Sequence, residues 1–170
     1  MRPTTMRPFF AGTFGRNISW QPLLLLVLSI FSGTSVADTL DLSSYRGKLV
    51  LVDFWASWCA PCRKSLPWLN EMQTRYGHRG LVVIGVNVDS SREAVDRFLK
   101  EVPAQFAIVY DPAGAIAAQY EVPGMPTSFL YGPNGELIEH HVGFKQADLL
   151  RREAKLKLLL PAATEPNERQ

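Results

Sequence analysis

Several features that define whole classes of protein are scarce in this sequence. Its 170 residues include only two cysteines and three histidines, and the formal net charge is +2. Two cysteines exclude a small scaffold held together by several disulfides. So weak a charge does not indicate a nucleic-acid-binding surface, and no nucleic-acid partner is expected. With 46% hydrophobic residues, the chain has the composition of an ordinary globular protein.

A long hydrophobic run is also missing. The apolar run Leu23–Phe31 spans nine residues, follows three arginines, and precedes the small residues of 35–37. A bilayer span needs roughly 20 apolar residues, whereas this order of residues is typical of a secretory signal peptide. We expect residues 1–37 to be removed between Ala37 and Asp38, with a retained membrane anchor as the alternative. In either case the domain is expected outside the cytoplasm, in the periplasm, where disulfides persist.

The rest of the chain alternates between strand and helix patterns, which predicts one domain over residues 38–160 and a polar tail over 161–170. The last predicted helix has Leu149, Leu150, Leu156 and Leu159 facing inward. Strands that alternate with helices and end in a hairpin indicate an α/β fold, with a mixed central sheet and helices on both faces. The expected strands are 49–56, 81–88, 106–110, 127–131 and 136–142, and the expected helices 63–76, 91–102, 113–120 and 146–160.

The two cysteines lie close together, as Cys59-Ala60-Pro61-Cys62, between a predicted strand and a predicted helix. Their spacing puts both sulfurs on one face of the first helical turn, within reach of a disulfide. The unpaired N–H groups of the helix N-terminus favour a thiolate at Cys59, and the thiolate is the nucleophilic form. A static disulfide is the alternative, but one that closes four residues restrains the unfolded chain very little. The motif therefore predicts redox chemistry.

Two segments carry a resemblance to a known family. Residues 52–62, VDFWASWCAPC, closely resemble the active-site segment of the thioredoxin superfamily, and Gly124-Met125-Pro126-Thr127 resembles its cis-proline loop. The stretch between Asp89 and Pro126 is longer than a minimal thioredoxin needs, and is similar to the extra helix and strand of the TlpA-like and peroxiredoxin-like branch. The chain thus resembles a TlpA-like periplasmic thiol–disulfide oxidoreductase, and the resemblance implies a thioredoxin-like three-layer fold.

The resemblance also implies roles for individual residues around the motif. Cys59 corresponds to the attacking thiolate and Cys62 to the resolving cysteine. Pro126 corresponds to the cis-proline that faces the disulfide, and Met125 presents its backbone to a substrate chain. Trp58 lines the substrate-facing surface.

Other positions complete this expected site. Ala60 and Pro61, between the cysteines, belong to the same substrate-binding surface as Trp58. Asp53 corresponds to the superfamily's buried acid, and burial among apolar residues disfavours its charged form. Such an acid is suited to taking the proton from Cys62. A salt-bridged structural aspartate is the alternative.

Two positions depart from the family's pattern. Many TlpA-like proteins have a glutamate three residues after the second cysteine, where this chain has Ser65. The thioredoxin lysine that faces the buried acid corresponds to Gly85. On this reading Asp53 acts without a charged neighbour.

The expected function is exchange of the Cys59–Cys62 dithiol and disulfide with protein substrates, in the direction of disulfide reduction. The family implies a membrane thiol-electron transporter as reductant, and the sequence has no cofactor-binding motif. An oxidase or isomerase is the alternative. A thiol peroxidase is disfavoured because its Pro-x-x-x-Thr-x-x-Cys pattern is absent around Cys59.

A metal-binding module is the remaining alternative. Closed zinc or copper sites need three or four ligands, and the further candidates are His78, His140 and His141. Adjacent residues of a strand point to opposite faces, so only one of His140 and His141 could join a site. No metal site is expected.

Overall fold

A computed structural model describes residues 40–162. The predicted signal peptide and its cleavage point lie outside these residues, as does most of the predicted polar tail. Within the described part, no helix is long and apolar enough to cross a bilayer. The strands are β1 (Leu49–Trp55), β2 (Leu81–Asn87), β3 (Ala107–Tyr110), β4 (Thr127–Tyr131) and β5 (Leu137–Val142), and the α-helices are α1 (Ala60–Tyr76), α2 (Arg92–Glu101), α3 (Ala115–Gln119) and α4 (Leu149–Leu159).

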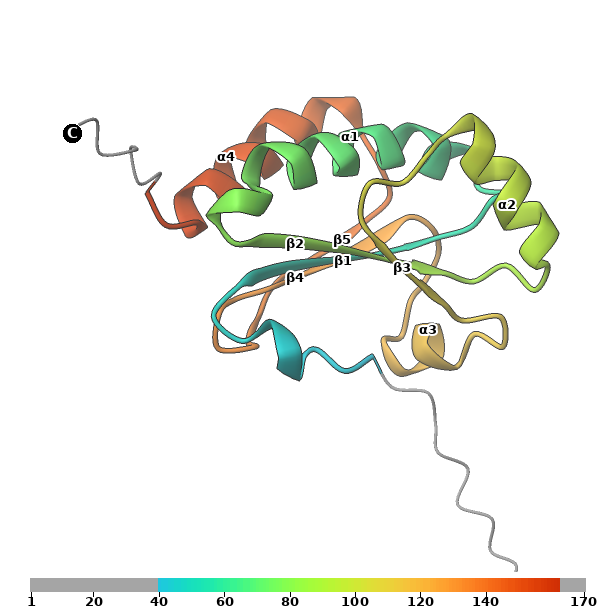
Figure 1. Ribbon diagram of the computed structural model, residues 1–170, viewed down its shortest axis with the longest axis horizontal. Helices are drawn as coiled ribbons and strands as arrows, with labels where there is room; N and C mark the ends of the chain where they lie inside the picture. Colours follow the sequence, from blue (N-terminus) through green and yellow to red (C-terminus); the bar gives the residue numbers. More distant parts are fainter. Residues whose placement is uncertain (1–39, 163–170) are drawn as a thin grey trace, which may run out of the picture. The chain divides into compact units, whose positions relative to one another are not determined.

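The five strands form one mixed sheet in the order β3-β2-β1-β4-β5 (Figure 1). β1 lies at the centre, parallel to β2 and antiparallel to β4, and all seven of its residues are buried. The register places Asp53 between Gly85 on β2 and Ser128 on β4. A strand buried on both faces is expected to be almost wholly apolar, so the acid at its centre is the exception.

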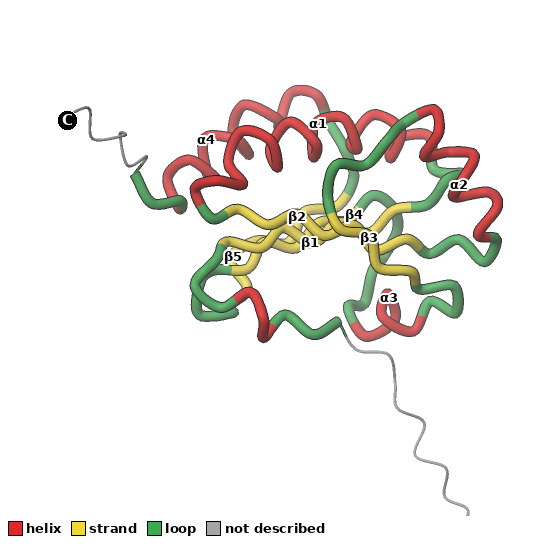
Figure 2. Tube along the Cα trace, in the orientation of Figure 1, coloured by secondary structure: helices red, strands yellow, loops and turns green. Residues whose placement is uncertain are grey.

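Helices cover both faces of the sheet, which gives three layers (Figures 1 and 2). α1, α2 and α4 lie on one face, where Leu51, Trp68 and Leu156 belong to one buried cluster. α3 lies on the other face, where Ile116 packs with Val52 and Phe54. Because successive side chains of a strand alternate between faces, Asp53 points to the side of α1 and α4.

The observed elements confirm the predicted fold and its extra helix and strand. These are α2 and β3, inserted between β2 and α3. Element ends differ from the predictions by a few residues, because α1 already begins at Ala60 and α4 only at Leu149.

The predicted inward face of α4 is wrong at one position. Leu150 is 82% exposed, while Arg152 and Leu156 are buried. Helix positions three and four apart share a face, so Leu149, Arg152 and Leu156 form the inner stripe. The spacing of the leucines alone did not predict that an arginine belongs to this inner stripe.

Gly85 has no room for a side chain. A Cβ added there would lie 2.8 Å from the Phe106 ring and 2.9 Å from Trp55 Nε1. We therefore predict that Gly85→Ala lowers the free energy of unfolding by about 1–3 kcal/mol, because overpacking forces neighbours out of their positions. Urea denaturation measures the change. Gly124→Ala is the control, since a Cβ there meets no atom within 4 Å; equal losses in the two variants would contradict the steric explanation.

Candidate active site

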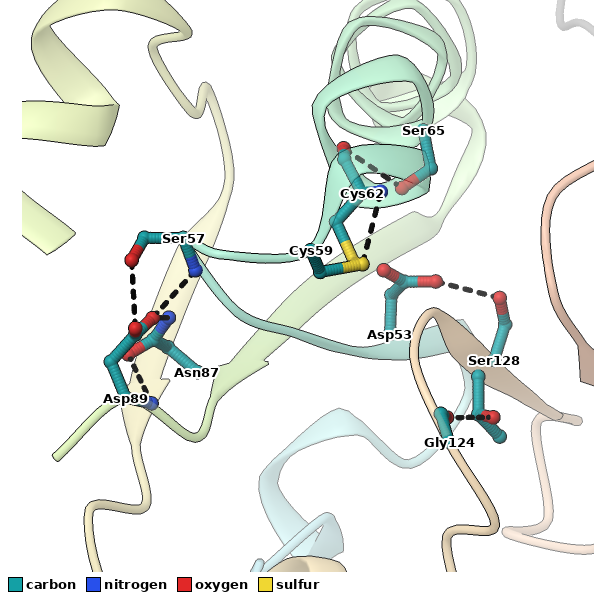
Figure 3. Close-up of a disulfide and its surroundings, with 10 residues drawn as sticks. Asp53, Ser57, Cys59, Cys62, Ser65, Asn87, Asp89, Gly124 and Ser128 are labelled. Carbon is teal, nitrogen blue, oxygen red and sulfur yellow. Dashed lines mark hydrogen bonds between the residues drawn. A yellow bond between two sulfur atoms is a disulfide. The ribbon is translucent and has the colours of Figure 1, made fainter.

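Cys59 and Cys62 form a disulfide at the start of α1, with an S–S distance of 2.02 Å (Figure 3). Cys59 is the N-cap of the helix, and its sulfur accepts a hydrogen bond of 3.2 Å from the Cys62 N–H. Pro61 follows in the first turn, where its missing N–H removes no helical bond. The helix N-terminus thus directs a donor at the Cys59 sulfur, which is the arrangement that stabilises a thiolate.

The two cysteines differ in their access to solvent. Cys59 is 5% exposed and Cys62 fully buried. Trp58, Ala60 and Pro61 are exposed around them, and the Trp58 side chain is 70% exposed. A substrate sulfur can therefore approach Cys59 over this surface more readily than it can approach Cys62.

The loop before β4 completes the rim of the site. The Met125–Pro126 peptide bond is cis, as the resemblance implied. Met125 packs against the cluster that contains Cys59 and Cys62, while Pro126 itself is buried. The Thr127 hydroxyl donates a 2.6 Å hydrogen bond to the Gly124 carbonyl and closes the loop. The structure thus brings both predicted segments together.

Asp53 lies directly behind the disulfide. Its side chain is 1% exposed, and burial raises its pKa to about 7, against smaller opposing effects of Ser128 and Arg152. One carboxylate oxygen, Oδ1, accepts a 2.7 Å hydrogen bond from Ser128 Oγ, and Oδ2 has no hydrogen-bond partner among residues 40–162. Figure 3 shows one oxygen turned toward Ser128 and the other toward the disulfide. An acid with its pKa near neutrality beside a sulfur can exchange a proton with it.

The expectation that Asp53 has no charged neighbour is wrong. Arg152 on α4 is buried, and its Nη2 donates a 3.0 Å hydrogen bond to Ser128 Oγ. The cation comes from the last helix of the domain and not from β2, where Gly85 stands. Ser65 of α1, which stands where many TlpA-like proteins have a glutamate, donates a hydrogen bond to the Cys62 carbonyl and brings no charge.

Comparison with known proteins shows the family of this chain. Residues 30–140 match the model of the AhpC/TSA family. The chain belongs to the AhpC/TSA family. The thiol–disulfide oxidoreductase ResA of Bacillus thuringiensis subsp. konkukian is 34% identical over 122 residues, which cover 72% of this chain and 69% of that protein.

Solved structures give the same result. The crystal structure of a Chlorobium tepidum protein assigned as the thiol:disulfide interchange protein DsbE is 44% identical, with a TM-score of 0.68, over 71% of this chain and 85% of that one. StoA from Bacillus subtilis is 30% identical, with a TM-score of 0.55, over 64% and 84%. The thioredoxin-like fold and the TlpA-like resemblance are thereby confirmed, and this AhpC/TSA member is a thiol–disulfide oxidoreductase.

The two adjacent histidines of β5 point to opposite faces of the sheet in this AhpC/TSA domain. His140 stacks on Phe129, with ring centroids 4.6 Å apart. His141, one residue on, lines a small cavity with Arg152 on the opposite face. Among residues 40–162, no three His, Cys, Asp or Glu side chains are grouped so that they could hold a metal ion.

Sequence reasoning missed a second carboxylate of the site, Asp89. It is 7% exposed and accepts three hydrogen bonds of 2.7 Å, from the Ser57 N–H, the Ser57 hydroxyl and the Asn87 amide (Figure 3). These bonds fix the loop that leads to Cys59. The only sequence signal is an acid two residues beyond the end of β2, which many loops share.

We predict that Asp89→Ala destabilises the oxidised protein by on the order of 3 kcal/mol, because it leaves several buried donors unpaired. Ser57→Ala removes only the hydroxyl bond, so a loss of about 1 kcal/mol is expected. Urea denaturation of the two variants measures both values. Similar losses would show that Asp89 does not act through this set of bonds.

Proposed function

We propose that the protein reduces disulfides of exported proteins, with Cys59 as the attacking and Cys62 as the resolving cysteine. One observation carries the proposal: the disulfide lies between a helix N-terminus, which directs a donor at Cys59, and the unpartnered oxygen of Asp53. The first cysteine is thereby prepared for attack and the second for loss of a proton.

The reaction has two exchange steps. In the reduced protein, the Cys59 thiolate attacks a substrate disulfide, bonds to one substrate sulfur and releases the other as a thiolate. Asp53 then takes the proton from Cys62, and the new thiolate attacks the Cys59 sulfur. The Cys59–Cys62 bond forms, the second substrate thiolate leaves, and the proton passes from Asp53 to solvent.

Electrostatics support reduction as the direction. A buried carboxylate beside the sulfurs raises the free energy of a thiolate there, since like charges repel strongly in a medium of low dielectric constant. Strong oxidants of this superfamily owe their potential to a stabilised reduced form. Asp53 works against that stabilisation and so favours the disulfide state of the protein, which makes its dithiol a reductant.

The location and the electron donor follow from the same proposal. The basic, apolar and small residues of the first 37 positions support export to the periplasm. After each turnover the Cys59–Cys62 disulfide must be reduced again, and we propose a membrane thiol-electron transporter as the donor. Trp58, Ala60, Pro61 and Met125 form the surface on which both the donor and the substrate dock, and the buried Pro126 supports it from below.

We predict that the domain reduces insulin disulfides and that Cys59→Ser abolishes turnover. Cys62→Ser leaves a mixed disulfide trapped on Cys59, because attack still occurs while resolution does not. Mass analysis of the trapped species checks this. Normal turnover by Cys62→Ser would reverse or remove the two roles.

Asp53 makes stability depend on pH. Because the pKa of Asp53 is raised from 3.8 to about 7, the folded protein holds a proton that the unfolded chain releases. Its contribution to the free energy of unfolding therefore falls as pH rises from about 4 to about 7 and is constant above. We predict that Asp53→Asn removes this slope and gains roughly 1–3 kcal/mol at pH 8. Urea denaturation across this pH range measures it.

The role of Asp53 also predicts the rates of the two exchange steps, which stopped-flow kinetics measure. Asp53→Asn should slow resolution while leaving attack by Cys59 nearly unchanged. Asp96→Asn, which changes an exposed acid on α2, is the matched control and should affect neither. Lost stability at pH 8 with normal resolution would instead identify Asp53 as a structural, charge-paired aspartate.

A further inference from the structure

A chain of two hydrogen bonds joins α4 to the acid behind the disulfide. Arg152 Nη2 donates to Ser128 Oγ over 3.0 Å, and Ser128 Oγ donates to Asp53 Oδ1 over 2.7 Å. Arg152 is 8% exposed, and its guanidinium lies over the Trp68 ring at 4.6 Å from the centroid. Packing against an aromatic face fixes the plane of a guanidinium, so the donor to Ser128 has little freedom to move.

The chemistry of these groups fixes the direction of both bonds. A guanidinium can only donate, so the Ser128 oxygen must accept from Arg152. A serine hydroxyl has a single hydrogen, and the oxygen that accepts from Arg152 therefore directs this hydrogen to Asp53 Oδ1. Asp53 Oδ1 is then occupied as an acceptor, and Oδ2 is the oxygen left to bind a proton.

We infer that Arg152 is a positioning residue for the resolving step: through Ser128 it holds Asp53 so that Oδ2 is the oxygen that takes the proton from Cys62. This inference rests on the proposed reductase function and assigns to α4 a part in it. Arg152 touches no reacting atom. Its positive charge, together with the Ser128 bond, also favours the carboxylate over the acid.

Among residues 40–162, the other charged and titratable groups near this cavity are neutralised or paired elsewhere. From β5, His141 faces the same cavity, but burial and the neighbouring Arg152 lower its pKa, which favours its neutral form. Glu139 of β5 and Lys155 of α4 line the same cavity and form an ion pair with each other. Asp148, before α4, pairs with Arg151 at 3.2 Å. Each nearby acid other than Asp53 thus has its own partner.

In the described part of the chain, the residues of β2 and α1 beside Asp53 carry no charge. From β2 its neighbour is Gly85, and from α1 the disulfide and Ser65 lie on this side. The cavity between Ser128, His141 and Arg152 measures about 20 Å³, which is space for a single water molecule. Arg152 and Asp53 are both buried as well, so bulk solvent screens their charges only weakly.

Removing Arg152 should shift the pH dependence of resolution and not that of attack. Resolution requires the Asp53 carboxylate, so its rate rises with pH through the pKa of that group. Loss of a nearby buried cation raises such a pKa by about one unit or more. In Arg152→Met, the midpoint should move up by about this amount, and the rate below the midpoint should fall roughly tenfold.

A single reaction separates the two steps. An aromatic disulfide such as dithionitrobenzoic acid loses one coloured thiolate when Cys59 attacks and a second when Cys62 resolves the mixed disulfide. Both rates are therefore read from one stopped-flow trace of the reduced, full-length protein at each pH. Arg152→Lys, which keeps the charge, should restore most of the wild-type midpoint, and Ser128→Ala, which breaks the chain of bonds, should raise the midpoint as Arg152→Met does.

Controls make each outcome decisive. Arg151→Met changes the adjacent, exposed arginine and should leave both phases unchanged. In an Asp53→Asn background, Arg152→Met should add no further shift. If Arg152→Met does not fold, Ser128→Ala carries the test. Reduced stability with an unmoved midpoint, or a Lys variant that behaves like Met, would overturn the inference. A wild-type trace without a second phase would instead contradict the proposed function itself.

Discussion

A carboxyl group buried in the middle of the central strand is the constraint around which this domain is arranged. Asp53 is only 1% exposed, and a buried carboxylate is costly unless hydrogen bonds or opposite charge compensate it. The sheet register places Ser128, a hydrogen-bond donor, on one side of Asp53 and Gly85, which has no side chain, on the other. The last helix supplies Arg152. Ser128 and Arg152 offset the cost of burying the Asp53 carboxylate only in part. The acid can therefore change its protonation state near neutral pH.

The two cysteines are supported by different parts of the molecule. Cys59 ends a loop that Asp89 fixes through Ser57, so its position depends on the end of β2. Cys62 is buried in the first turn of α1, on the side of Asp53, so the polar groups behind it come from β1, β4 and α4. This separation matches the two exchange steps, in which one sulfur must meet a substrate and the other must lose a proton away from solvent.

Much of this arrangement could be predicted from the sequence. The strand and helix patterns gave the layers, and the segment around Cys59 and Cys62 gave the redox chemistry, because both signals are local along the chain. The partners of Asp53 could not be found in this way. Arg152 lies 99 residues further along the chain. The leucine pattern of its helix also misled, because it placed Leu150 inside, whereas Leu150 is exposed and Arg152 is buried. Asp89 was missed for a similar reason, since only the folded loop brings it to Ser57.

The reduction potential of the Cys59–Cys62 couple, measured by equilibration with glutathione, tests the central claim most directly. A disulfide favoured by the neighbouring buried carboxylate predicts a potential more negative than about −200 mV, toward the value of about −270 mV found for thioredoxin. A potential near about −120 mV, typical of strong oxidants with a stabilised dithiol form, would contradict the account and make the protein a donor of disulfides.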